Sequence, residues 1–195
     1  STAMPMPTRL RTLTATRIPY HSPGPPADAG RTRGSAKGFS APGRSSSLAR
    51  MALNPGRVVA HLRELQALTG DAAGAQRVAW TDTWNTARVW LIGLLDGVPL
   101  ERELDEAGND WWTLRGDSER AVLIGGHIDS VPNGGWLDGA LNVVAGAEVL
   151  RRIAGEGRPP VTVRLVNWAD EEGARFGRSL FGSSAAGGSM SDQDE

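Results

Sequence analysis

The feature that most limits how this chain can fold is a strand, helix, strand unit in its second half. Residues 120–126, RAVLIGG, and residues 160–169, PVTVRLVNWA, are apolar runs of strand length. Residues 139–157 between them carry apolar side chains at helical spacing, namely Val143, Ala147, Leu150 and Ala154. Because such a unit most often connects parallel strands, it predicts an α/β fold whose ligands gather beyond the carboxyl ends of those strands.

Further elements are predicted upstream of this unit. Residues 54–70 favour a helix, because a capping Asn precedes Pro55 and apolar residues then share one face. A second helix is predicted from Thr83 to Leu95 by the same spacing. Residues 99–116 then favour two strands around a Gly108–Asn109 turn, so the sheet is expected to be mixed, with helices on its faces.

Residues 1–50 differ in composition from the rest of the chain. They are rich in Pro, Gly, Ser, Thr and Arg and carry a net charge of +7, whereas residues 51–195 carry −8. The first segment has too few large apolar residues to bury, so it is predicted to be disordered. Two alternatives stay open: the natural chain starts at Met51, or residues 1–50 are a transit peptide.

Composition also limits where the protein acts and what it binds. The acidic balance of residues 51–195 argues against nucleic acid as a partner. No apolar run approaches the roughly 20 residues that a membrane-spanning helix needs, so no membrane partner is expected. We expect a cytoplasmic protein, or an organellar one if residues 1–50 are a transit peptide.

Polar residues with the chemistry of a metal site follow both strands of the unit. His127 and Asp129 come directly after the first strand, Asp138 precedes the helix, and Asp170 with the pair Glu171 and Glu172 follows the second strand. The chain has no Cys, so imidazole and carboxylate are the ligands available, and they suit zinc, manganese, cobalt or nickel. The DEEG motif alone is typical of a solvated turn, but the joint position of both motifs favours a metal site.

The spacing within each motif suggests a division of roles. In His127-x-Asp129, the carboxylate can accept the hydrogen bond of the ring nitrogen that does not bind metal, which would fix the tautomer. In the pair Glu171 and Glu172, one carboxylate can bind metal while the other serves as a general base. Two like charges side by side also raise the pKa of one of them.

Residues 125–150, GGHIDSVPNGGWLDGALNVVAGAEVL, and 166–185, VNWADEEGARFGRSLFGSSA, resemble the signature blocks of a known enzyme family. This family is the two-metal amidohydrolases of the hydantoinase/carbamoylase type: N-carbamoyl-L-amino-acid hydrolases, allantoate amidohydrolases and β-ureidopropionases, relatives of the zinc carboxypeptidases and aminoacylases. Residues 77–91 and 103–116 also match its upstream pattern. The resemblance spans about residues 52–190.

The resemblance implies a role for each residue of the two motifs. His127 would bind one metal ion, Asp138 would bridge both ions and Glu172 would bind the other, with zinc as the expected metal. Asp129 would support His127. Glu171 would be the general base that activates a bridging water for attack on an amide or ureido carbonyl, and it would then pass the proton to the departing nitrogen.

The chain also departs from this family. Members supply two further His ligands and a lid and dimerisation domain from beyond the second block, whereas the histidines here are His21, His61 and His127. Residues 51–195 are therefore expected to be the N-terminal part of the catalytic domain, inactive alone and homodimeric in full-length form. Hydrolysis of N-carbamoyl-L-amino acids is the expected activity. Aminopeptidase or aminoacylase activity and a catalytically silent fragment are the alternatives.

Overall fold

The computed structural model describes residues 52–190. The disorder and transit-peptide hypotheses for residues 1–50 therefore lie outside the described residues. In chain order the elements are α1 (Pro55–Thr69), β1 (Gly70–Asp71), β2 (Gly74–Ala75), α2 (Asp82–Leu94), β3 (Glu101–Leu104), β4 (Asp110–Leu114), β5 (Ala121–His127), α3 (Ala140–Gly155), β6 (Thr162–Trp168) and α4 (Phe181–Ala186).

The sheet has four strands in the order β3-β4-β6-β5. Strands β5 and β6 are parallel and are connected through α3, which confirms the strand, helix, strand prediction. Strands β3 and β4 form the predicted hairpin, and β4 pairs antiparallel with β6. The sheet is therefore mixed, as expected, and the carboxyl ends of β5 and β6 lie at the same edge.

The two upstream helices lie within one residue of their predicted bounds, and the predicted Asn54 cap of the first is confirmed. The Asn54 side chain accepts a hydrogen bond from the Arg57 backbone N–H at 3.0 Å, and Pro55 occupies the first turn of α1. The Thr81 hydroxyl caps α2 by accepting a hydrogen bond from the Trp84 N–H. The short hairpin β1–β2 and the helix α4 were not predicted.

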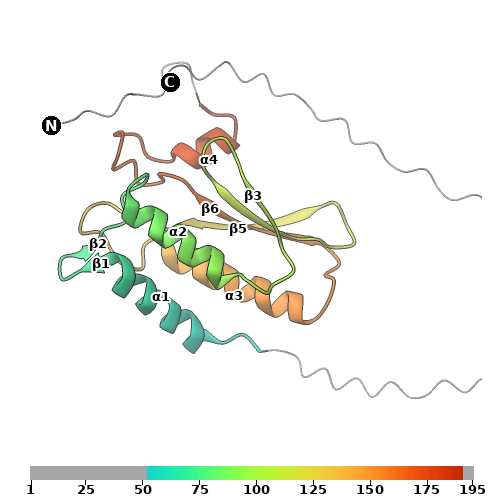
Figure 1. The fold of residues 1–195 in the computed structure, drawn as a ribbon. Coiled ribbons are helices and arrows are strands. Elements are labelled where there is room, and N and C mark those ends of the chain that lie inside the picture. The colour runs from blue at the N-terminus through green and yellow to red at the C-terminus, as the bar shows by residue number, and fades with distance from the viewer. Residues whose placement is uncertain (1–51, 191–195) are drawn as a thin grey trace, which may run out of the picture. The chain divides into compact units, whose positions relative to one another are not determined.

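The helices α1, α2 and α3 pack together on one side of the sheet (Figure 1). Helix α3 contacts β5 and β6, and α1 contacts both α2 and α3. At Gly146 of α3, a Cβ would lie 2.6 Å from the Leu165 side chain of β6, so glycine allows close approach of the helix to the sheet. Buried apolar side chains fill the space between them, including Leu62, Leu65, Trp84, Leu91, Trp112, Val143, Leu150 and Leu165.

Glu148 ties the start of α1 to α3. Its carboxylate accepts hydrogen bonds from the Asn54 backbone N–H at 2.9 Å and from the Arg57 guanidinium at 2.7 and 2.8 Å. Its side chain is only 5% exposed. The hydrogen bonds from Arg57 lower the pKa of Glu148 below its ordinary value of 4.5, against the opposing effect of burial.

We expect Glu148→Gln to lower the free energy of unfolding at pH 7 by about 1.5–3 kcal/mol, the range for hydrogen bonds to a charged group. Because folding lowers the pKa of Glu148, its contribution is complete above the unfolded pKa and is lost as the pH falls through the folded value. Urea unfolding at several pH values measures this difference, which should shrink below about pH 4.5. The exposed Glu119→Gln is the control. A difference unchanged down to pH 2 would contradict the electrostatic explanation.

Among the described residues, no helix is long and apolar enough to cross a membrane.

Candidate metal centre

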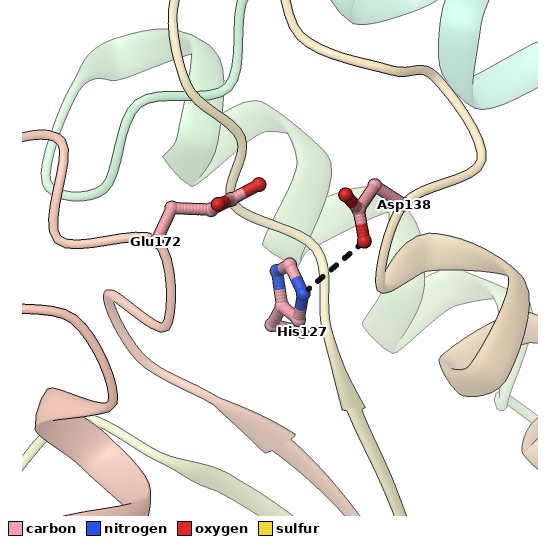
Figure 2. A group of neighbouring side chains, drawn as sticks. All are labelled: His127, Asp138 and Glu172. Carbon is pink, nitrogen blue, oxygen red and sulfur yellow. Dashed lines mark ion pairs between the residues drawn. The ribbon is translucent and has the colours of Figure 1, made fainter.

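The candidate site lies where the carboxyl ends of β5 and β6 meet the start of α3. His127 is the last residue of β5 and pairs in register with Trp168 at the end of β6. Asp138 lies two residues before α3, and Glu172 lies in the loop after β6. Figure 2 shows the three side chains converging from these separate segments. The prediction that both motifs meet at one edge of the sheet is therefore confirmed.

Three side chains form a group that could hold a metal ion: His127, Asp138 and Glu172. One ligand atom from each lies within 4.8 Å of the others. The His127 Nε2 is 3.9 Å from Asp138 Oδ1, and Figure 2 marks this pair with a dashed line. Ligand atoms about 2.1 Å from a tetrahedral zinc ion are roughly 3.4 Å apart, so side-chain shifts of about 1 Å would complete the contacts.

Glu171 lies beside the same imidazole. Its Oε2 is 3.4 Å from His127 Nε2, and its side chain is 29% exposed. Asp138 is more open, with 68% of its side chain exposed, whereas His127 is buried. The site is therefore buried at the imidazole and exposed to solvent on the side of Asp138.

Asp129 supports His127 in a way that differs in detail from the prediction. The His127 Nδ1 lies 3.1 Å from the Asp129 main-chain oxygen, whereas the Asp129 carboxylate Oδ1 is 3.6 Å away. The other carboxylate oxygen accepts a hydrogen bond from the Glu172 backbone N–H at 3.2 Å. Donation from Nδ1 to the main chain would leave Nε2 free to bind metal, and the Asp129 carboxylate also links the two loops.

The carboxylates at this edge of the sheet affect one another and the imidazole. Burial lowers the pKa of His127, but Asp129 and Glu171 outweigh burial, so the net pKa lies above its ordinary value. Burial raises the pKa of Glu172, and the negative charges of Asp138, Glu171 and Asp129 raise it further against the opposing charge of His127. Bound cations would relieve this excess of negative charge.

Asp170 is a buried acid of the site, which the sequence groups with the other acids at this edge of the sheet but to which it assigns no role. It has a positive φ of 49° and is 1% exposed. Burial, followed by the charge of Asp129, raises its pKa to about 6. Its position next to Glu171 and Glu172 was a signal in the sequence, but nothing there indicated that it is buried.

Gly139 allows the backbone to approach the imidazole closely. Its φ is +58°, and a Cβ at this position would overlap the His127 ring. A glycine beside Asp138 is therefore required both for this backbone conformation and for the contact.

Of the other two histidines, His61 is the one among the described residues. It lies on α1, where its Nδ1 is 3.4 Å from Glu64 and its ring contacts Trp90 edge-on, away from the candidate metal ligands. His21 lies outside the described residues.

Comparison with known proteins shows that part of the chain is similar to a broad class of hydrolases. The sequence model of Peptidase family M28 matches residues 111–193. Among curated proteins, the allantoate amidohydrolase of Bacillus subtilis is 33% identical over 62% of this chain and 30% of its own length. The N-carbamoyl-L-amino-acid amidohydrolase of Paenarthrobacter aurescens is 31% identical over 71% of this chain and 34% of its own.

A solved structure is similar over the same extent of chain. The hydantoinase/carbamoylase family amidase from Burkholderia ambifaria has a TM-score of 0.69 and is 29% identical, and the match covers 73% of this chain and 36% of that one. Over the matching part, the chain is therefore related to the amidohydrolases of the hydantoinase/carbamoylase type, as its two motifs predict. It spans about a third of the length of the curated relatives that it matches.

Proposed function

We propose that this chain carries part of the active site of a metal-dependent hydrolase of linear amide C–N bonds, most specifically of N-carbamoyl-L-amino acids. The observation that carries the proposal is the group formed by His127, Asp138 and Glu172, with Glu171 beside the same imidazole. Imidazole and carboxylate are borderline and hard ligands that suit zinc or manganese. The relatives named as amidohydrolases support the reaction type.

Two divalent ions would fit the roles that we propose, with Asp138 between His127 and Glu172. Bound metal would polarise the scissile carbonyl and make a water more acidic. Glu171 would accept a proton from that water and return it to the leaving nitrogen, because a general base needs to stand within reach of the water without being a ligand. Asp129 would keep His127 in the tautomer that presents Nε2 to the site.

The experiment that tests this function uses the gene product that contains this chain. After removal of metal with a chelator and addition of zinc or manganese, ammonia release is measured from an N-carbamoyl-L-amino acid. The D-enantiomer is the control for specificity. We expect the added metal to restore ammonia release from the L-form. Metal-independent release, or no release under any metal, would contradict the proposal.

A peptidase is the second candidate, because the matching family model is that of Peptidase family M28. The same assay separates the two when a dipeptide and an N-acetyl-L-amino acid are included as substrates. The amidohydrolase proposal expects the largest kcat/KM for the N-carbamoyl substrate. A larger kcat/KM for the dipeptide would favour the peptidase.

The 195-residue chain by itself is expected to show negligible hydrolysis, with or without added zinc or manganese. The group within residues 52–190 supplies one imidazole and two carboxylates, whereas the resemblance calls for two further imidazoles. An ion held by so few ligands is loosely placed, so it cannot orient a substrate well. Ammonia release by the purified chain measures this, and turnover comparable to that of a full-length relative would contradict it.

A further inference from the structure

A buried side chain outside the two motifs holds the loop that carries Glu171 and Glu172. Asn109 lies at the turn between β3 and β4 and is fully buried. Its Oδ1 accepts a hydrogen bond from the Ala169 backbone N–H at 2.9 Å, and its Nδ2 donates to the Gly182 carbonyl at 2.9 Å. These partners are 60 and 73 residues away along the chain.

The orientation of this amide is fixed from its own turn. Asp105 accepts hydrogen bonds from both the backbone N–H and the Nδ2 of Asn109, each at 2.9 Å. The same Asp105 carboxylate accepts a hydrogen bond from the Trp111 Nε1 at 2.9 Å. Because Nδ2 faces two acceptors and Oδ1 faces a donor, a flipped amide would lose all three side-chain bonds.

Ala169 and Gly182 are the two ends of a closed loop. The backbone N–H groups of Leu180, Phe181 and Gly182 donate to the carbonyls of Glu171, Asp170 and Ala169 at 2.7, 3.3 and 2.9 Å. Asn109 therefore binds both ends of the loop at its base. Glycine at 182 is needed for this contact, because a Cβ there would overlap Asn109 Oδ1.

We propose that Asn109 is a positioning residue, which fixes the position and orientation of the loop that presents Glu171 and Glu172 to the metal. It touches neither the ions nor the substrate in this role. The inference rests on the proposed function, because it assigns a purpose to Asn109 through those two carboxylates. It adds a residue from the β3–β4 hairpin to a site otherwise built from the loops after β5 and β6.

Three substitutions in the 195-residue chain test this role. Asn109→Ala removes all three side-chain bonds, and Asn109→Asp keeps the acceptor for Ala169 but loses the donor to Gly182 and faces Asp105 with a second carboxylate. Gly182→Ala keeps the Asn109 residue, but its Cβ would overlap both the Asn109 amide oxygen and the Ala169 backbone at the base of the loop. The controls are Asn85→Ala, at an exposed position of α2, and Leu62→Ala, which lowers stability from the core without touching the loop.

The first measurement needs no metal: amide hydrogen exchange over residues 169–182, followed by mass spectrometry. We expect exchange there to be about tenfold faster in Asn109→Ala and Gly182→Ala, the size expected for lost hydrogen bonds. Asn85→Ala should leave it unchanged. Leu62→Ala should lower the melting temperature at least as much without selective acceleration in this loop. Acceleration no greater than in Leu62→Ala would overturn the proposal.

The second measurement is the zinc affinity of the same substitutions, made in the gene product that contains this chain, by calorimetry. We expect the Kd for zinc to rise by roughly 10- to 100-fold in Asn109→Ala and Gly182→Ala, as for other groups that support metal ligands. Zinc affinity equal to that of the unmodified gene product would overturn the positioning role while leaving the metal site intact. If the unmodified gene product binds no zinc, the proposed metal site fails, and hydrogen exchange alone decides whether Asn109 holds the loop.

Discussion

Replacing Glu171 with Gln is expected to reduce turnover of the gene product by roughly 10²–10⁴-fold, the range for a general acid–base group. Its bound metal should remain nearly unchanged. Glu171 Oε2 lies 3.4 Å from His127 Nε2, yet the residues that offer converging ligand atoms are His127, Asp138 and Glu172. The change keeps the size of the side chain and removes its ability to accept a proton.

Steady-state kinetics and elemental analysis of the same protein samples measure both effects. Glu172→Gln is the informative partner, because it should lose metal as well as activity. Glu106→Gln, at an exposed position of the β3–β4 turn, should change neither. Loss of metal in Glu171→Gln with retention in Glu172→Gln would mean that the roles of the two residues are exchanged.

The convergence of the two motifs was predictable because parallel strands end at a common edge. The apolar runs identify β5 and β6, and each motif follows the last residues of its strand. The register that places His127 opposite Trp168 then brings the loop after β6 to the imidazole. The apolar runs of the two strands, and the rule that parallel strands end at a common edge, are sufficient to predict that His127 and the acidic loop meet.

The hydrogen bonds that hold the candidate metal ligands in place could not be predicted in the same way. Asn109 was identified only as a turn residue, because its two partners outside the turn are 60 and 73 residues away and are backbone atoms, which carry no sequence signal. The contact of His127 Nδ1 with a main-chain oxygen, in place of the Asp129 carboxylate, is likewise invisible in the motif. Such contacts depend on loop conformations that tertiary packing sets.

The missed elements are short. Strands β1 and β2 have two residues each, and α4 has six, so none offers enough residues for a hydrophobic period to be recognised. Leu180, just before α4, has a φ of 60°, a left-handed conformation that its residue type disfavours. Leu180 in this conformation donates the first of the backbone hydrogen bonds that close the loop over residues 169–182.

Asp138→Ala is expected to remove both metal ions together and to abolish detectable turnover. In the proposed centre Asp138 lies between His127 and Glu172, and its loss leaves each ion with one protein ligand from this part of the chain. The side chain is 68% exposed, so its removal should cost little folding stability. Thermal unfolding of the metal-free protein checks that point.

The count of divalent ions per molecule of the gene product that contains this chain, in wild type and in Asp138→Ala, tests the central claim most directly. Both proteins are purified without chelator, equilibrated with zinc and freed of loosely bound metal by gel filtration before elemental analysis. Asp117→Ala, which removes a comparably exposed carboxylate that precedes the start of β5, the opposite end of that strand from His127, is the control. We predict two ions for wild type and for the control, and none for Asp138→Ala. Two ions retained in Asp138→Ala would contradict a centre built on His127, Asp138 and Glu172.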